Sequence, residues 1–385
     1  MRMNSTPTIE IAKQLIAFDS VSTKSNAEIS DWVENRLQKA GFDIERVGYH
    51  DDAGKAKVNV IAKRFPANRK AASGGVCYLA HTDVVPADDW SPDFCNPFQP
   101  TIRDGRLFGR GACDMKGSLA CALAAAELLP ISEQRSPIYF IVTADEEIGM
   151  IGARHVDRES KLFDEMVATD TIGIVGEPTG LQVIHAHKGG LAIRIIARGR
   201  SAHSSSRDGL NANHQLIPLL PLLLEIQQQC ETDSSLQNQD FDPPTLSWNI
   251  VLRNEPFASN ITPSLAEAIV FLRPMPNVEH EPLIVRVEEA AAKLGLECFR
   301  REAAHPLHVD RSFDCIASML RLTEQTQSLT VCYATDGGVL QRLRQLVVCG
   351  PGSIEQAHRS DEWISLEQLE RGTRLYYRAF EHWTG

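Results

Sequence analysis

The sequence predicts an α/β protein with a mostly parallel central sheet, flanking helices and a second, inserted α+β domain. Three observations support this fold class. Short apolar runs alternate with helical segments in the first half of the chain, which is typical of βαβ units. Residues 184–303 then follow the order β-α-β-β-α-β, the order of a ferredoxin-like unit. The α/β pattern returns after residue 304, so we expect the first domain to be interrupted by the second.

The chain is expected to open with two helices. Thr6 and Pro7 suit a helix start, because proline is favoured at the first helical position. In the second helix, apolar residues from Ile29 to Ala40 share one face, and Gly41 is placed to end it.

The first domain, residues 1–183, is then predicted to form its sheet. Runs of four to six apolar residues have the length of buried strands, and one long apolar segment has the length of a helix. The predicted strands are VNVIA (58–62), VCYLA (76–80), IYFIVT (138–143) and IGIV (172–175), with the helix SLACALAAAELL (118–129) between the second and the third.

The inserted domain, 184–303, and the closing section, 304–385, complete the predicted fold. The insert has four strand-like segments and two helices, which lie at 213–229 and 282–295. The closing section returns to the first domain, with a helix at 313–325, a strand at 345–350 and a terminal helix at 365–383.

Composition excludes several classes of partner. The 385 residues carry a formal net charge of −11, which disfavours nucleic acid and anionic membrane surfaces and suits a site built from carboxylates. The most apolar stretch, LIPLLPLLLEI (216–226), is far shorter than the ~20 residues of a membrane span. We therefore expect neither a nucleic acid nor a membrane as partner.

Cysteine usage and the N-terminal residues indicate the compartment. The nine cysteines are odd in number and contain no C-x-x-C pair, which fits reduced thiols. The N-terminal apolar residues are interrupted by Glu10 and Lys13, unlike the core of a signal peptide. These features predict a cytoplasmic protein.

Polar residues follow several of the predicted strands. His81 and Asp83 end one strand, Glu146 and Glu147 follow another, and Glu177 follows a third. Ligands of open α/β sheets bind outside the carboxyl ends of the strands, so these side chains are candidates for one site. A structural alternative exists, because a strand-end histidine beside an aspartate often only stabilises the fold.

Two further residues complete a possible metal-ligand set. Asp114 precedes the helix 118–129, where a helix-capping role is the alternative, and His358 lies in a late loop, where a solvated surface role is the alternative. His81, Asp114, Glu147, Glu177 and His358 together form a set of two histidines and three carboxylates that suits two divalent metals bridged by one carboxylate.

Glu146 remains outside that set. A carboxylate beside metal-activated water is the expected general base. Neighbouring residues of an extended chain point to opposite sides, so Glu146 and Glu147 could take different roles.

Five segments resemble the metal-site motifs of the di-zinc aminoacylase and deacylase family, in the same order and across almost the whole chain. They are AHTDVVP, GRGACDMKG, TADEEIG, GEPT and CGPGSIEQAH. The resemblance implies two Zn²⁺ ions, although the same ligands accept Co²⁺ or Mn²⁺. It assigns one zinc to His81 and Glu177, the other to Glu147 and His358, the bridge to Asp114, acid–base catalysis to Glu146, and orientation of His81 to Asp83.

The same resemblance assigns a function to the insert, as a lid and dimerisation domain of a homodimer. His203, in GRSAHSSSRDGLNAN, matches a histidine that reaches the partner subunit's site and holds the substrate carbonyl oxygen. Asn260 and Arg273 match substrate-binding residues, and a guanidinium suits an α-carboxylate. The alternative is that these three are surface residues of the insert.

Within the family, CGPGSIEQAHRSDEW is most similar to the acetylornithine deacetylases. This likeness predicts a small N-acyl amino acid as substrate, N2-acetyl-L-ornithine, hydrolysed to acetate and L-ornithine. The segment Thr335-Asp336-Gly337-Gly338 departs from the Thr-Glu-Ala usual in those enzymes and partly resembles the Ser-Gly-Gly of desuccinylases. Charge complementarity suggests that Asp336 contacts the side-chain amine of ornithine.

Other activities use the same metal residues. They are succinyl-diaminopimelate desuccinylase, acetylcitrulline deacetylase and related dipeptidases or aminoacylases. A catalytically silent binding protein is an alternative of another class, but such a protein is expected to have lost the base or a ligand, and all are present here.

Overall fold

The computed structural model describes residues 6–67 and 74–385, and the chain divides into two compact units. The first unit comprises the chain up to His185 together with His308–Leu329 and Thr335–Gly385. The second comprises Ala186–Leu307 and Thr330–Ala334. The first unit is therefore discontinuous in sequence.

The central sheet of the first unit is parallel in its middle and antiparallel at its edges. Its strands follow the spatial order β1 (Asp43–His50), β2 (Ala56–Arg64), β6 (Ile138–Thr143), β3 (Val76–His81), β7 (Ile172–Val175) and β15 (Leu346–Val348). The pairs β6–β3, β3–β7 and β7–β15 are parallel, whereas β1–β2 and β2–β6 are antiparallel. The sheet continues, where the chain leaves and re-enters this unit, with β8 (Ile184–His187), β13 (Leu307–His308) and β14 (Leu329–Val331).

Burial explains the pattern of the central strands. Every residue of β3, β6 and β7 is buried, so these strands are apolar at almost every position instead of alternating. Only Val47 of β1 is buried, which is why its polar sequence did not predict a strand.

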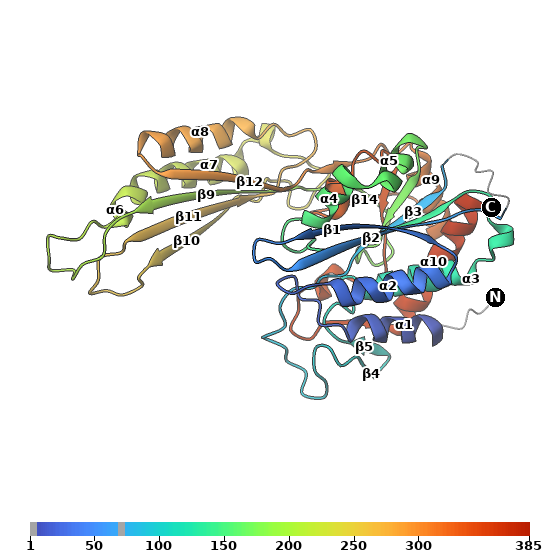
Figure 1. The fold of residues 1–385 in the computed structure, drawn as a ribbon. Helices are drawn as coiled ribbons and strands as arrows, with labels where there is room; N and C mark the ends of the chain where they lie inside the picture. The colour runs from blue at the N-terminus through green and yellow to red at the C-terminus, as the bar shows by residue number, and fades with distance from the viewer. Residues whose placement is uncertain (1–5, 68–73) are drawn as a thin grey trace. The chain divides into compact units, whose positions relative to one another are not determined.

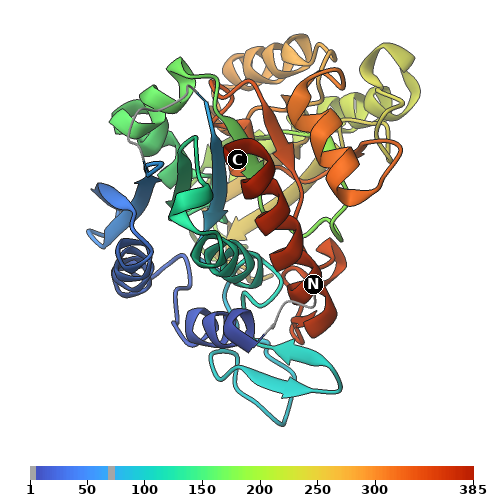
Figure 2. The same ribbon diagram turned by 90° about the vertical axis from the view of Figure 1, so that its right-hand side faces the viewer.

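Helices cover both faces of this sheet (Figure 1). One face carries α1 (Thr6–Ile16), α2 (Ala27–Lys39), α3 (Lys116–Leu128) and α10 (Leu366–Thr384), and the other carries α4 (Ile151–Glu159) and α5 (Lys161–Ala168). Figure 2 shows α10 lying across α3, and the helix α9 (Asp314–Thr323) packs against α10 and β15. Gly41, with φ of +85°, follows α2 at the predicted helix end.

A small antiparallel sheet was not predicted. Its strands are three residues long, too short for a periodic signal, and follow the order β16 (Trp363–Ser365), β5 (Arg106–Phe108) and β4 (Thr101–Arg103). It joins segments that lie on either side of the second unit in sequence.

The second unit has the expected ferredoxin-like topology. Its four antiparallel strands follow the order β10 (Asn249–Glu255), β11 (Leu265–Leu272), β9 (Gly190–Arg198) and β12 (Glu297–Ala304). The helices α7 (Leu220–Thr232) and α8 (Glu281–Lys293) cover one face (Figure 1), and Leu223, Ile226, Ile284 and Val287 of these helices enter its core.

The predicted helix 213–229 is interrupted. It consists of α6 (Ala212–Leu216), a short 3₁₀ segment (Ile217–Leu219) and α7. Pro218 and Pro221 lack the backbone N–H that a continuous helix requires, which accounts for the break. In the described parts of the chain, no helix combines the length and apolar character needed to cross a lipid bilayer.

Candidate metal centre

Three neighbouring strands bring predicted site residues to one edge of the central sheet. His81 is the last residue of β3, Glu146 and Glu147 follow β6, and Glu177 follows β7. Because these strands are adjacent and parallel, their carboxyl ends lie at the same edge. The remaining two predicted ligands come from loops, with Asp114 just before α3 and His358 after β15.

The five predicted ligands meet in two groups that share Asp114. Oδ1 of Asp114 lies 3.1 Å from Nε2 of His81, and Oδ2 lies 3.4 Å from Nε2 of His358. Glu177 Oε1 is 3.8 Å from His81 Nε2, and Glu147 Oε2 is 3.0 Å from His358 Nε2. Each oxygen of one carboxylate therefore faces a different histidine, as expected of a bridge between two cations.

Charges are crowded in this site, and burial makes the crowding costly. Burial raises the pKa of the Glu147 and Glu177 carboxyls, and the negative charge of Asp114 raises both further. Burial also opposes ionisation of Asp114, but hydrogen bonds from His358 and His81 lower its pKa below the ordinary value. Hydrogen bonds to Asp114 and Glu147 raise the pKa of His358 to about 10.

These residues fit a pair of divalent cations. Imidazoles and carboxylates are the ligands of dinuclear hydrolytic sites, and the candidate ligand atoms of each group all lie within 4.8 Å of one another. Two cations would compensate carboxylates whose charged forms are otherwise disfavoured. The group His81, Asp114 and Glu177 is called triad 1 below, and the group Asp114, Glu147 and His358 is called triad 2.

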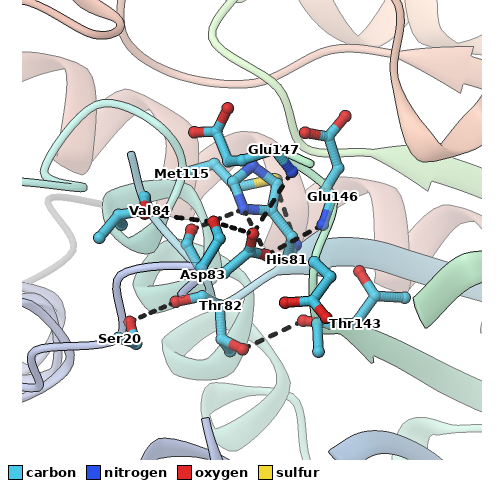
Figure 3. Close-up of polar contacts among 12 residues, drawn as sticks. Ser20, His81, Thr82, Asp83, Val84, Met115, Thr143, Glu146 and Glu147 are labelled. Atoms are coloured by element: carbon cyan, nitrogen blue, oxygen red, sulfur yellow. Dashed lines mark hydrogen bonds and ion pairs between the residues drawn. The ribbon is translucent and has the colours of Figure 1, made fainter. Parts of the chain in front are cut away.

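Asp83 interacts with His81 mainly through its backbone. Nδ1 of His81 lies 2.9 Å from the carbonyl oxygen of Asp83 and 3.6 Å from its carboxylate. A proton held on Nδ1 by that carbonyl leaves Nε2 directed at Asp114. The Asp83 carboxylate instead accepts hydrogen bonds from the backbone N–H groups of Glu146 and Glu147 (Figure 3). It also accepts one from the hydroxyl of Ser22.

Glu146 and Glu147 lie in a turn, so the extended chain assumed from the sequence is wrong here. The carbonyl oxygen of Glu146 accepts from the N–H groups of Gly149 and Met150. Figure 3 shows both glutamate side chains extending away from the Asp83 carboxylate that holds their backbone. Only Glu147 belongs to a triad, and burial raises the pKa of Glu146 well above its usual range.

Asp145, the residue before the two glutamates, is paired with a lysine outside the two triads. It is fully buried, with φ of +55°, and lies 2.5 Å from Nζ of Lys57. The hydroxyl of Tyr49 donates to its other oxygen at 2.8 Å. Lys57, Tyr49 and Ser22 thus support the turn, and sequence reasoning missed all three because these contacts are long-range.

Asp336 belongs to the first unit and lies beside the end of β6. The hydroxyl of Thr143 donates to its Oδ2 at 2.5 Å. Its buried Oδ1 has no hydrogen-bond partner among the described residues. Burial raises the pKa of Asp336 to about 6, and nearby Asp83 adds to this shift.

The other predicted residues belong to the second unit. His203 and Asn260 are both exposed and lie on adjacent segments, since the N–H of Ser204 donates to the carbonyl of Asn260 and His203 forms a bridge with Ile261. Arg273 follows β11, and its guanidinium carbon lies 5.0 Å from the ring centroid of Phe271.

The chain is similar to known hydrolases in fold and in sequence. Residues 77–382 match the profile of peptidase family M20/M25/M40. Acetylornithine deacetylases from Myxococcus xanthus and Proteus mirabilis are each 31% identical to this chain, covering 97% of it and 96% of their own length. An M20-family metallo-carboxypeptidase from Sulfolobus solfataricus superposes with a TM-score of 0.74 at 17% identity, over 98% of this chain and 99% of its own.

This fold, together with two ligand triads that share Asp114, defines a metal-dependent hydrolase. The chain belongs to peptidase family M20/M25/M40. A dinuclear metal-binding peptidase of the same family from Bacillus subtilis has a similar fold, with a TM-score of 0.64 at 16% identity over 98% of this chain and 97% of its own.

Proposed function

We propose that the protein hydrolyses the amide bond of N2-acetyl-L-ornithine, releasing acetate and L-ornithine. The reaction class rests on one observation: Asp114 is shared by two ligand triads, and the partly buried Glu146 stands outside both. The substrate is supported by the 31% identity to two acetylornithine deacetylases.

We assign two zinc ions to the site. Triad 1 would hold one ion and triad 2 the other, with Asp114 contributing to both. Ions of this kind increase the acidity of water and polarise a carbonyl group. Three of the five ligands are carboxylates, whose negative charges would offset much of the charge of two dications.

Glu146 is assigned the proton transfers. Its raised pKa, caused by burial and by neighbouring Glu177 and Asp336 despite the opposing charge of His81, makes it a better base than an exposed glutamate. It would accept a proton from the attacking water and donate it to the leaving amine. The Asp83 carboxylate supports this role by fixing the Glu146 backbone.

Asp336 is assigned to the side-chain ammonium of the substrate. Its Oδ1 is buried without a hydrogen-bond partner in the described chain, and a buried oxygen of this kind gains from a cationic donor. For the substrate carbonyl we assign His203, and for the α-carboxylate Asn260 and Arg273, on the resemblance of their sequence segments.

We further propose a cytoplasmic homodimer formed through the second unit. All nine cysteines are free, which suits a reducing compartment. In the second unit, β10 is an edge strand on which Val251 and Leu252 are about half exposed, and an apolar edge of this kind favours pairing with another chain. In such a dimer, His203 would act in the site of the partner.

A substrate panel tests the proposal. Purified, zinc-loaded protein should hydrolyse N2-acetyl-L-ornithine with a higher kcat/KM than N-succinyl-diaminopimelate, N-acetylcitrulline or a dipeptide, and chelation should abolish turnover. Preference for the succinyl amide would assign the desuccinylase activity instead. Lack of turnover with every amide, in protein shown to contain metal, would support a silent binding protein.

Mixing of two inactive variants tests the shared site. A His203→Ala chain combined with a Glu146→Gln chain should recover part of the activity, because a mixed dimer would contain one complete site. No recovery in verified heterodimers would contradict the role of His203 in the partner's site.

A further inference from the structure

Glu362 is a buried carboxylate that belongs to neither triad. It is 1% exposed, and it accepts four hydrogen bonds. Oε1 accepts from the backbone N–H groups of Cys113 at 2.8 Å and Asp114 at 3.0 Å. Oε2 accepts from the N–H of Gly111 at 2.8 Å and from Nη1 of Arg110 at 3.0 Å. The carboxylate thus organises the backbone that carries the shared ligand.

Arg110 extends this contact to the loop of His358. The guanidinium is also 1% exposed, and its Nη1 donates to the carbonyl oxygen of Arg359 at 2.9 Å. Arg359 directly follows His358, whose φ is +62°. The backbone N–H of Gly109 donates to the carbonyl of Glu362 at 3.1 Å, which joins the same two segments again.

The two segments joined in this way carry two of the three ligands of triad 2. Asp114 and His358 are 244 positions apart in sequence and neither lies on a strand of the central sheet. In triad 1, by contrast, His81 ends β3 and Glu177 follows β7, so the sheet itself positions them. Loss of Glu362 should therefore affect the two triads unequally.

We propose that Glu362 and Arg110 form a positioning pair that sets the metal affinity of triad 2. The inference rests on the proposed dinuclear function but adds residues that touch neither metal nor substrate. Glu362 holds the Asp114 backbone from one side, and Arg110 links it to the His358 loop. Outer partners of metal ligands typically change metal affinity by about 10- to 100-fold when they are replaced.

The test is a metal titration of the full-length protein after chelation, with Zn²⁺ alone and no substrate. The variant Glu362→Gln keeps the side-chain shape but replaces one carboxylate oxygen by an NH₂ group. That group cannot accept a hydrogen bond, so it faces N–H donors without a partner for them. We expect two binding steps in the unchanged protein. In the variant, one step should weaken about 10- to 100-fold and the other by a smaller factor, because Asp114 is shared but only triad 2 also contains His358. Saturating Zn²⁺ should then restore most of kcat with little change in KM.

Glu45→Gln is the matched control. Glu45, on β1, also accepts backbone N–H groups, from Lys161 and Leu162, and the hydroxyl of Ser160. These three partners lie at the start of α5, and none belongs to a loop that carries a metal ligand. This variant should bind both ions as tightly as the unchanged protein.

Arg110→Lys gives an independent result if Glu362→Gln fails to fold. It keeps the positive charge beside Glu362 but loses the planar guanidinium that contacts both Glu362 and the carbonyl of Arg359. The binding step of triad 2 should therefore weaken, by a smaller factor than in Glu362→Gln. Equal weakening of both steps, or no change in either variant, would overturn the inference. Binding of a single ion by the unchanged protein would instead contradict the proposed dinuclear function.

Discussion

Triads 1 and 2 share Asp114 but are built on different kinds of support. In triad 1, His81 and Glu177 are 1% and 5% exposed and lie at the ends of parallel strands. In triad 2, the His358 side chain is 54% exposed on a loop. A buried ligand set on strands is held by the sheet, whereas the loop set depends on contacts such as that of Arg110 with Arg359. We therefore expect triad 1 to bind its ion more tightly than triad 2.

The largest expected effect comes from a residue in neither triad. Glu146→Gln should lower kcat by at least about 100-fold, since a general base is lost. Its metal content should remain that of the unchanged protein, because both triads are intact. Steady-state kinetics and elemental analysis of the same sample check this, and retained turnover would exclude Glu146 as the base.

Removing one histidine from each triad tests the comparison directly. His358→Ala should remove the weaker step of a Zn²⁺ titration, and His81→Ala the tighter one. Each loss should exceed the roughly 10- to 100-fold typical of an outer partner, because a direct ligand is removed. Calorimetric titration of both variants measures this. The opposite assignment of steps would show that strand support does not decide affinity.

Asp336 allows a smaller, substrate-dependent test. Asp336→Asn keeps an oxygen for the hydroxyl of Thr143 but removes the negative charge. The value of kcat/KM for N2-acetyl-L-ornithine should fall about tenfold, whereas that for N-acetyl-L-methionine, which has no side-chain cation, should change little. An equal fall for both substrates would show that Asp336 acts on the site and not on the ornithine side chain.

The smallest expected effect is a pH dependence of stability in metal-free protein. Burial raises the pKa of Glu146 and Glu177 above 4.5, so between that pH and the raised values the folded protein holds more protons than the unfolded chain. The pKa of His358, raised to about 10 by Asp114 and Glu147, acts in the same direction, and its contribution is lost as pH rises from 6.5. The free energy of unfolding should therefore fall as pH rises.

Bound metal should compensate this loss, because ions bind the deprotonated ligands. The difference in Tm between zinc-loaded and chelated protein should widen by a few degrees from pH 5.5 to 8.5. Thermal melts at several pH values measure it. A difference in Tm that stays constant across this range would show that metal binding does not compensate the charges of the deprotonated ligands.

The sequence predicted the elements whose burial is complete. The strands β3, β6 and β7 are apolar at almost every position, and all their residues are buried. It did not predict β1, whose exposed residues follow no apolar pattern, or the break of the helix 213–229. Local hydrophobic patterns therefore predict buried strands well, whereas they carry little information about exposed strands at the edge of a sheet.

In the site, too, the sequence predicted some residues and not others. The motifs identified the five residues that form the two triads. Three of them stand out as polar residues at the ends of apolar strands, whereas Asp114 and His358 lie in loops. The supporting residues were missed, since Glu362 and Gly111 are 251 positions apart and meet only in the folded chain. The acidic pair Asp361 and Glu362 of SDEW, soon after His358, is the local signal that could have indicated Glu362.

Anomalous diffraction at the zinc absorption edge, from crystals of zinc-loaded protein, is the most direct test of whether Asp114 bridges two metal ions. Two peaks are expected, one on either side of Asp114 and roughly 3.5–4 Å apart as in two-metal sites. One peak should be ligated by His81 and Glu177 and the other by Glu147 and His358, with Glu146 bound to neither. A single peak, or a peak ligated by Glu146, would contradict this arrangement.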